Sequence, residues 1–88
     1  TGPFTELTLT AVTPLPMAVW EKKVRRLIAT CGSQLLRLKG VVPAAEGNVE
    51  FQFAGQTLFF QVTTLAAAGI MLIGTSLDEA TIRRIWED

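Results

Sequence analysis

Three segments with the periodicity of β-strands follow one another between residues 35 and 64, separated by only a few residues. They cover residues 35–42, 49–53 and 57–64, and apolar and polar side chains alternate in each, as is typical of half-buried strands. Because parallel pairing needs a crossover of about a dozen residues or more, neighbouring strands here must pair antiparallel. This feature restricts the chain to folds that are built on a mostly antiparallel sheet.

Two further strands and a first helix are indicated outside this region. Residues 5–12 alternate between apolar and polar side chains, whereas residues 70–73 are wholly apolar, which indicates a strand near the centre of the sheet. Between residues 17 and 31 the apolar side chains recur at every third or fourth position and predict a helix that packs on a sheet. These side chains are Met17, Trp20, Val24, Leu27, Ile28 and Cys31.

A capping-box pattern predicts the start of a last helix over residues 77–87. Ser76 is followed three positions later by Glu79, so that each side chain can accept a hydrogen bond from the backbone of the other residue. The complete order is then β-α-β-β-β-β-α. We interpret it as an α+β fold, a two-layer sandwich in which two helices cover one face of a mostly antiparallel β-sheet, and we expect residues 1–88 to form one domain.

The composition excludes several classes of protein. Hydrophobic residues make up 49% of the chain, too many for an intrinsically disordered protein. Eight Lys and Arg residues balance eight Asp and Glu residues, so no net charge attracts nucleic acid or an anionic membrane, and we expect neither as a partner. The longest apolar stretch, residues 65–73, is shorter than the ~20 residues that cross a bilayer.

The residue types that most often carry chemistry are scarce in this chain. It has no histidine, which is the commonest general base and metal ligand, and its one cysteine, Cys31, lies among the apolar residues of the first predicted helix. We interpret Cys31 as a small buried side chain. Asp78 and Glu79 are neighbouring carboxylates on successive helical positions and do not converge on one atom. We therefore expect no catalytic residues, no metal site and no cofactor-binding site.

Basic and aromatic residues occur in clusters that nucleic-acid-binding proteins also use. On a helical wheel, the cations of the first predicted helix lie opposite its apolar side chains, and we interpret them as a solvated helix face, the alternative being contact with an acidic partner. These cations are Lys22, Lys23, Arg25 and Arg26. Phe59 is expected on the outer face of its strand, where it can contact a partner. The order of elements differs from that of an RNA-recognition motif, so we expect no binding of oligonucleotides.

Arg37, Lys39 and Gly40 form a third candidate group, at the end of the first strand after the helix. Arg37 and Lys39 alternate with apolar neighbours, so that both are expected on the exposed face, with Leu36 and Leu38 on the buried one. A glycine at a strand end often marks a bulge or a close approach of two backbones. Two interpretations stay open for the cations, an ordinary strand surface or a docking surface for a neighbouring domain or an anionic ligand.

Two motifs in this order resemble the C-terminal domain of CobW-type proteins. The segment LLRLKGVV at residues 35–42 is similar to the R-x-K-G strand that follows the first helix of that domain. The segment LIGTSLD at residues 72–78 is similar to the I-G-x-x-L-D that opens its last helix. The helix entry with Pro14 and Pro16 is also similar, and the resemblance extends over nearly the whole chain. Residues 46–68 depart from it, because the Trp often found before the last strand is missing.

The resemblance implies a part of a cytoplasmic P-loop GTPase, either a metallochaperone for cobalt or zinc or a protein of cobalamin synthesis. GTP and a divalent metal would bind in an upstream domain, since this chain has neither a G-x-x-x-x-G-K-[ST] loop nor a C-x-C-C motif. The implied role is that of a non-catalytic accessory domain, not an enzyme by itself. Its partners would be the upstream GTPase domain and a metal-receiving client protein, contacted through Arg37, Lys39 and Gly40.

One alternative function stays open. The sequence begins at Thr1 without an initiator methionine, from which we expect a domain of a longer protein. The same composition also fits a free-standing α+β module that senses a ligand or forms a homodimer, because a small and strongly hydrophobic domain leaves apolar surface for a partner. A homodimer is therefore among the predicted assemblies.

Overall fold

The computed structural model describes residues 4–88 and has the predicted order of elements. They are β1 (Thr5–Thr10), α1 (Met17–Cys31), a short 3-10 helix η1 (Gly32–Gln34), β2 (Leu35–Val42), β3 (Val49–Ala54), β4 (Thr57–Val62), β5 (Gly69–Gly74) and α2 (Glu79–Glu87). The five strands form one sheet in the order β1-β5-β2-β3-β4, and all neighbours in it pair antiparallel. Within this part of the chain, neither helix has the length and apolar run that a membrane span requires.

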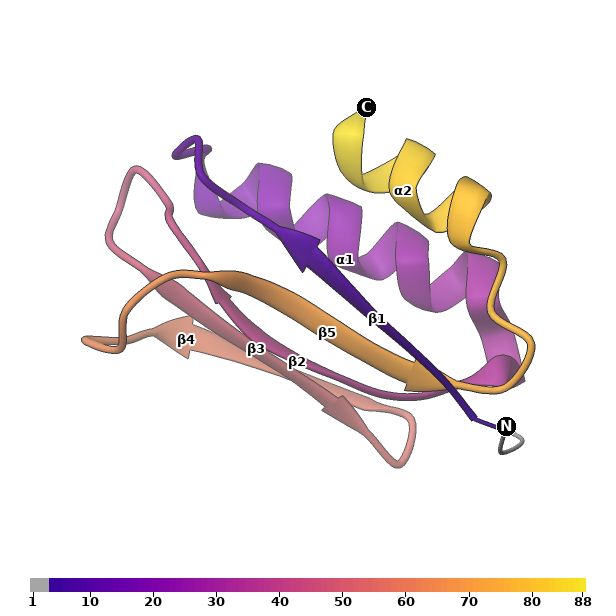
Figure 1. Cartoon of the computed structure of the whole chain (residues 1–88). Helices are drawn as coiled ribbons and strands as arrows, with labels where there is room; N and C mark the ends of the chain where they lie inside the picture. Colours follow the sequence, from indigo (N-terminus) through magenta and orange to yellow (C-terminus); the bar gives the residue numbers. More distant parts are fainter. Residues whose placement is uncertain (1–3) are drawn as a thin grey trace.

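The two helices lie side by side on one face of the sheet, as Figure 1 shows. The opposite face carries no helix from residues 4–88 and is called the open face below. This arrangement confirms the two-layer α+β sandwich. The wholly apolar strand β5 is an interior strand, between β1 and β2, as its composition predicted.

Two tryptophans in the core join the helices to each other and to the sheet. The rings of Trp20 in α1 and Trp86 in α2 are 4.9 Å apart between centroids, so they join the two helices. The N–H group of each buried indole also has a hydrogen-bond acceptor. Trp20 Nε1 donates to the carbonyl oxygen of Pro43 at 2.7 Å, and Trp86 Nε1 donates to the carbonyl oxygen of Thr10 at 2.8 Å. These bonds tie each helix to the end of a strand and fix its position over the sheet.

A β-bulge in β2 corrects one prediction from the sequence. Simple alternation predicted Leu36 and Leu38 on the same, buried face. The pairing of β2 with β5 shifts between Leu35 and Arg37, so Leu36 is the extra residue of a bulge. Leu35 and Leu38 are buried, whereas Leu36 is 42% exposed. Beyond the bulge the alternation resumes, and Arg37 is exposed as predicted.

The start of α2 corrects a second prediction. Ser76 is not the N-cap, because its φ of 52° places it in the left-handed region, whereas an N-cap residue has extended backbone angles. The cap is Asp78, whose carboxylate accepts hydrogen bonds from the backbone N–H of Thr81 at 3.2 Å and from its hydroxyl at 2.9 Å. Glu79 accepts from Arg83 at 2.8 Å and so stabilises the first turn by an ion pair rather than as part of a capping box.

The cap at Asp78 leads to a testable pH dependence. The hydrogen bonds from Thr81, its side chain first, lower the pKa of Asp78 below its ordinary value of 3.8. A carboxylate with a lowered pKa in the folded state stabilises the fold above the pKa of the unfolded chain, and this contribution is lost as the pH falls through the folded-state pKa. We expect Asp78→Asn, which keeps an oxygen acceptor, to reduce the loss of stability below about pH 4.

Thermal unfolding of both proteins over a pH series measures this effect. The expected result is that the melting temperatures of the wild type and of the Asp78→Asn variant converge as the pH falls. A constant difference between them at every pH would show that ionised Asp78 does not stabilise α2.

Candidate interaction surface

The register of the strands places the candidate residues of β2 at the middle of the open face. The side chains that alternate with the buried ones align across the sheet in rows of five. One row passes through the centre of the face and consists of Thr8, Met71, Lys39, Gln52 and Phe59. The next row consists of Glu6, Ile73, Arg37, Ala54 and Thr57. Arg37 and Lys39 are therefore flanked by side chains of β5 on one side and of β3 on the other.

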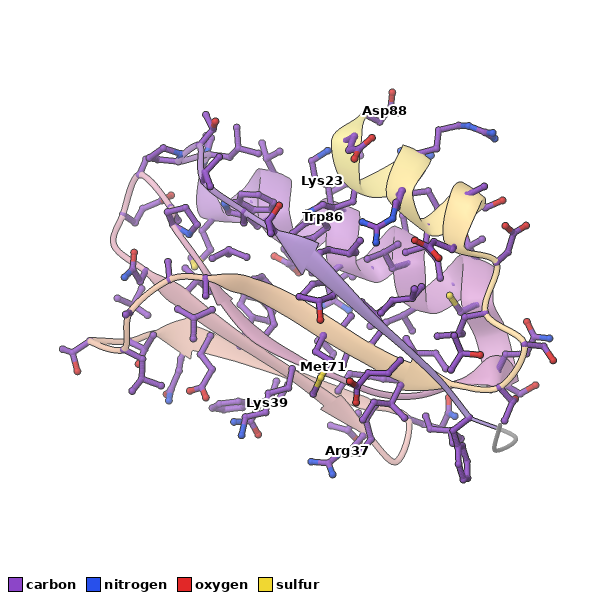
Figure 2. The ribbon with its side chains drawn as sticks, in the orientation of Figure 1. Lys23, Arg37, Lys39, Met71, Trp86 and Asp88 are labelled. Atoms are coloured by element: carbon purple, nitrogen blue, oxygen red, sulfur yellow. The ribbon has the colours of Figure 1, made fainter. Side chains whose placement is uncertain are left out.

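Arg37 and Lys39 lie around a shallow hollow with apolar walls. The hollow has a volume of about 220 Å³ and is lined by Arg37, Lys39, Met71 and Ile73. In Figure 2 the labelled side chains of Arg37, Lys39 and Met71 lie on the side of the sheet away from Lys23 and Trp86. Long basic side chains can cover apolar surface with their stems while the charged ends stay in water. This hollow thus offers apolar contact and positive charge together.

The two cations on the open face are available to a partner. The ion pairs found in residues 4–88 join Glu21 to Arg25, Arg26 to Asp88 and Glu79 to Arg83, so none of them involves Arg37 or Lys39. By register, the carboxylate nearest to Lys39 is Glu50, which accepts a hydrogen bond from Gln52 at 3.0 Å, and the one nearest to Arg37 is Glu6, two strands away in the same row.

Exposed apolar side chains accompany these cations. Phe59, which the sequence placed on the outer face of β4, is 50% exposed there, and Met71 is 36% exposed. Aromatic residues, Met and Arg are enriched in protein interfaces. The open face therefore suits a protein surface that presents carboxylates and apolar side chains.

Gly40 differs from its two neighbours because its position serves the sheet itself. A Cβ atom at Gly40 would overlap the carbonyl oxygen of Gly69 and would lie 2.5 Å from Cα of Ile70. The backbones of β2 and β5 thus approach each other closely at Gly40, which lies within β2 rather than at its end, and a glycine inside a strand often marks such an approach. Of the three predicted contact residues, the structure brings Arg37 and Lys39 together on the open face and gives Gly40 a structural role. A contact of Gly40 with a partner stays a prediction.

Lys23 overturns the prediction of a solvated face for all four cations of α1. Its side chain is buried, and Nζ donates hydrogen bonds to the backbone oxygens of Trp86 at 2.9 Å, Asp88 at 2.6 Å and Ile85 at 3.5 Å. Lys23 therefore binds the carbonyl end of α2. Figure 2 shows Lys23 near Trp86 and Asp88, on the helix side of the sheet. A helical wheel could not predict this role because it considers one helix alone, whereas α2 packs against the side of α1 on which Lys23 lies. The other three cations are exposed, as predicted.

Comparison with known proteins decides the family. The sequence model described as the cobalamin synthesis protein cobW C-terminal domain matches residues 4–88, and so all of the chain that the structure describes. The chain belongs to this family. The match confirms the resemblance carried by the two motifs at residues 35–42 and 72–78. No curated protein sequence matches this CobW C-terminal domain significantly.

Two solved structures share the fold of this CobW C-terminal domain. The crystal structure of the Zn(II)-bound YjiA GTPase from E. coli has a TM-score of 0.83 and 16% identity, and the similarity covers 97% of this chain but 29% of that one. A Zn(II)-bound triple mutant of the YjiA GTPase has a TM-score of 0.84 with the same identity and coverage. At such low identity the likeness concerns the fold alone. This chain spans less than a third of the YjiA chain.

The residues of this CobW C-terminal domain do not fit a zinc site. Zinc in proteins is held mainly by thiolates and imidazoles, and the chain has no histidine. Its one cysteine, Cys31, is buried in the core as predicted, and burial raises the pKa of its thiol, which disfavours the thiolate that a metal requires. Within residues 4–88, no three Cys, Asp or Glu side chains come together as a ligand set.

Proposed function

We propose that this CobW C-terminal domain is a non-catalytic, partner-contacting domain of a cytoplasmic CobW-like GTPase that serves metal trafficking or cobalamin synthesis. The observation that carries the proposal is the family match over residues 4–88. The chain itself has no phosphate-binding P-loop, and its described residues do not assemble zinc ligands. The likeness to part of a Zn(II)-bound GTPase supports the same division of labour, in which GTP and metal bind elsewhere in the protein.

The open face around Arg37 and Lys39 is the proposed contact with the GTPase domain of the same protein. These two cations have no ion-pair partner within residues 4–88, and they share the open face with two exposed apolar side chains, Met71 opposite Lys39 and Phe59 two strands away. A surface of the GTPase domain with carboxylates and apolar side chains would complement this face, because opposite charges guide association and apolar contact stabilises it. A metal-receiving client protein is a second partner for which the same face is suited.

The coding sequence upstream of Thr1 provides the first test. We expect a G-x-x-x-x-G-K-[ST] motif within the few hundred residues that precede this domain, because the motif forms the phosphate-binding loop of P-loop GTPases. An open reading frame that begins close to Thr1 would contradict the assignment to a GTPase and favour the free-standing module. GTP hydrolysis by the 88-residue chain alone would contradict its non-catalytic role.

A charge reversal on the open face tests the proposed contact. We expect the double variant Arg37→Glu/Lys39→Glu to bind the separately purified GTPase domain about tenfold or more weakly, which corresponds to about 1.4 kcal/mol in binding free energy. Isothermal titration calorimetry measures the dissociation constants. The matched control is Lys22→Glu/Arg84→Glu, which makes the same change in net charge at exposed positions on the two helices. Equal weakening by both double variants would show a general effect of charge and contradict a specific contact at Arg37 and Lys39.

A further inference from the structure

Strand β4 forms an edge of the sheet that lacks the usual protection. It is the last strand in the order β1-β5-β2-β3-β4, and its sequence TLFFQV contains neither a charged residue nor a proline. Phe59 and Val62 in it are 50% and 54% exposed. Edge strands in monomeric proteins usually carry charges, prolines, bulges or covering elements that prevent pairing with another chain. The regular pairing of β4 with β3 over all six residues shows no bulge.

The opposite edge strand, β1, shows what such protection looks like in this protein. It contains the carboxylate of Glu6. Its last residue, Thr10, accepts a hydrogen bond at 2.8 Å from the indole of Trp86, so that α2 is tied to this edge. In Figure 1, α2 lies over the β1 side of the sheet, and no helix runs along the outer edge of β4. Strand β4 has no charged residue, and no side chain from a helix bonds to it among the residues that the structure describes.

The hydrogen-bond pattern shows which backbone groups of β4 are free to pair. The N–H of Thr63 donates to the carbonyl oxygen of Asn48 at 2.8 Å, so this opposite pair is hydrogen-bonded. Hydrogen-bonded pairs alternate along an antiparallel ladder. Given the register of β3 and β4, the backbone groups of Thr57, Phe59 and Gln61 therefore point toward β3. Those of Leu58, Phe60 and Val62 point outward, in the direction of a sixth strand.

We infer that β4 pairs antiparallel with β4 of a second copy of this chain, about a two-fold axis at Phe60. In this register Phe60 faces its own counterpart and Leu58 faces Val62 of the second copy, so the outward backbone groups of both strands are satisfied. On the open face Phe59 lies opposite Gln61, and no like charges meet because β4 has none. The chain as a whole has a formal net charge of zero, so two copies do not repel each other.

The helix side of β4 also favours this occupant. A hollow of about 220 Å³ separates α1 from the end of the β3–β4 hairpin, and Ile28, Phe53 and Leu58 line it together with Arg25, Ala29 and Gln56. Leu58, which lines this gap, and Phe60 are both only half-buried. Val62 of the second copy would extend the apolar cover beside Leu58 and bury its own exposed surface. The interface leaves out Arg37 and Lys39, although Phe59 belongs to both surfaces. The inference is based on the edge of β4 and not on the proposed function.

Amide hydrogen exchange, followed by NMR on the 88-residue chain over a concentration series, tests the register directly. We expect the amides of Leu58, Phe60 and Val62 to gain protection as the concentration rises to about 1 mM, while those of Phe59 and Gln61 are protected at every concentration. Sedimentation equilibrium should show a mass that rises toward twice the 9.6 kDa of one chain. Two-strand interfaces are small, so a weak and concentration-dependent dimer is expected.

Two substitutions at Val62 separate the dimer from the fold. Val62→Lys places a charge against the apolar Leu58 of the second copy and is expected to raise the dissociation constant of the dimer about tenfold or more. The matched control Val12→Lys makes the same change at an 86% exposed position beyond the opposite edge strand and should leave dimerisation unchanged. Val62→Pro removes an N–H group that points outward from the sheet. An edge strand of a monomer tolerates this change, so we expect the variant to fold, but a strand that is paired on both sides does not, so we expect the variant not to form the dimer.

Three results would overturn the inference. One is a single-chain mass at about 1 mM protein. Another is a dimer in which the amides of Leu58, Phe60 and Val62 exchange as fast as in the monomer, because it would form through another surface. The third is protection of these amides at every dilution in a longer protein that contains this domain, which would show that a strand of the same chain occupies the edge.

Discussion

Replacement of Gly40 by alanine is expected to destabilise this CobW C-terminal domain by about 3 kcal/mol or more, a large part of the stability of a domain of this size. The added Cβ meets backbone atoms of Gly69 and Ile70 and the Cγ2 atom of Ile70 at 2.8 Å. Backbone atoms of a neighbouring strand cannot rotate away as the end of a flexible side chain can. Relief therefore requires β2 and β5, two interior strands, to separate. Urea denaturation followed by circular dichroism measures the loss.

Gly55→Ala is the matched control for this prediction. Gly55 lies in the tight turn between β3 and β4 with a φ of 58°, and no atom lies within 4 Å of the position that its Cβ would take. Alanine there meets only the cost of the left-handed backbone conformation, about 1–2 kcal/mol. If Gly40→Ala lowers the free energy of unfolding by no more than Gly55→Ala does, then β2 and β5 do not approach each other closely at Gly40 in solution.

The expected effect at Gly40 also changes how the contact surface can be tested. A variant that separates β2 from β5 would displace Lys39 and Met71 as well, since they are opposite each other in the same strand pair. Loss of binding in that variant would say nothing about a contact at Gly40 itself. Arg37 and Lys39 are exposed and unpaired within residues 4–88, so their charges can be reversed without disturbing the core.

Much of the fold could be predicted from the sequence because the patterns act locally. The connection between β3 and β4 consists of Gly55 and Gln56, both with positive φ, and such a tight turn permits only an antiparallel hairpin. The alternation in β3 likewise predicts the buried side chains of Val49, Phe51 and Phe53. The apolar run of β5 predicted its interior position, but the full order β1-β5-β2-β3-β4 could not be predicted, because it depends on which distant strands pair and the alternating strands show the same period at an edge and in the interior.

The candidate site was predictable to the same extent. Arg37 and Lys39 follow the alternation of β2 and do lie on the open face. Leu36 departs from the alternation because a bulge inserts one residue, and no residue type marks that position in advance. The exposed edge at β4 has a signal in the sequence, the absence of charge and proline in TLFFQV, but only the strand order shows that this segment is an edge.

Substitution of Lys23 by methionine is expected to destabilise the protein by about 1.5–3 kcal/mol, because hydrogen bonds from a charged group to buried acceptors are stronger than neutral ones. Nζ of Lys23 bonds the backbone oxygens of Ile85, Trp86 and Asp88, and thus the negative end of the α2 dipole. Methionine keeps an unbranched apolar stem but offers no donor, so the oxygens of Ile85 and Trp86 lose their partner in a buried position. Chemical denaturation measures the change in unfolding free energy.

Lys22→Met is the control, since it makes the same change one residue earlier, at an exposed position of α1. Surface substitutions of this kind usually change stability by less than about 0.5 kcal/mol. Amide exchange should further show that Lys23→Met loosens the last turn of α2, where Trp86 packs on Trp20 at 4.9 Å between ring centroids. Equal stability of the two variants would mean that Lys23 does not hold α2, and that Trp20 and Trp86 suffice to join the helices.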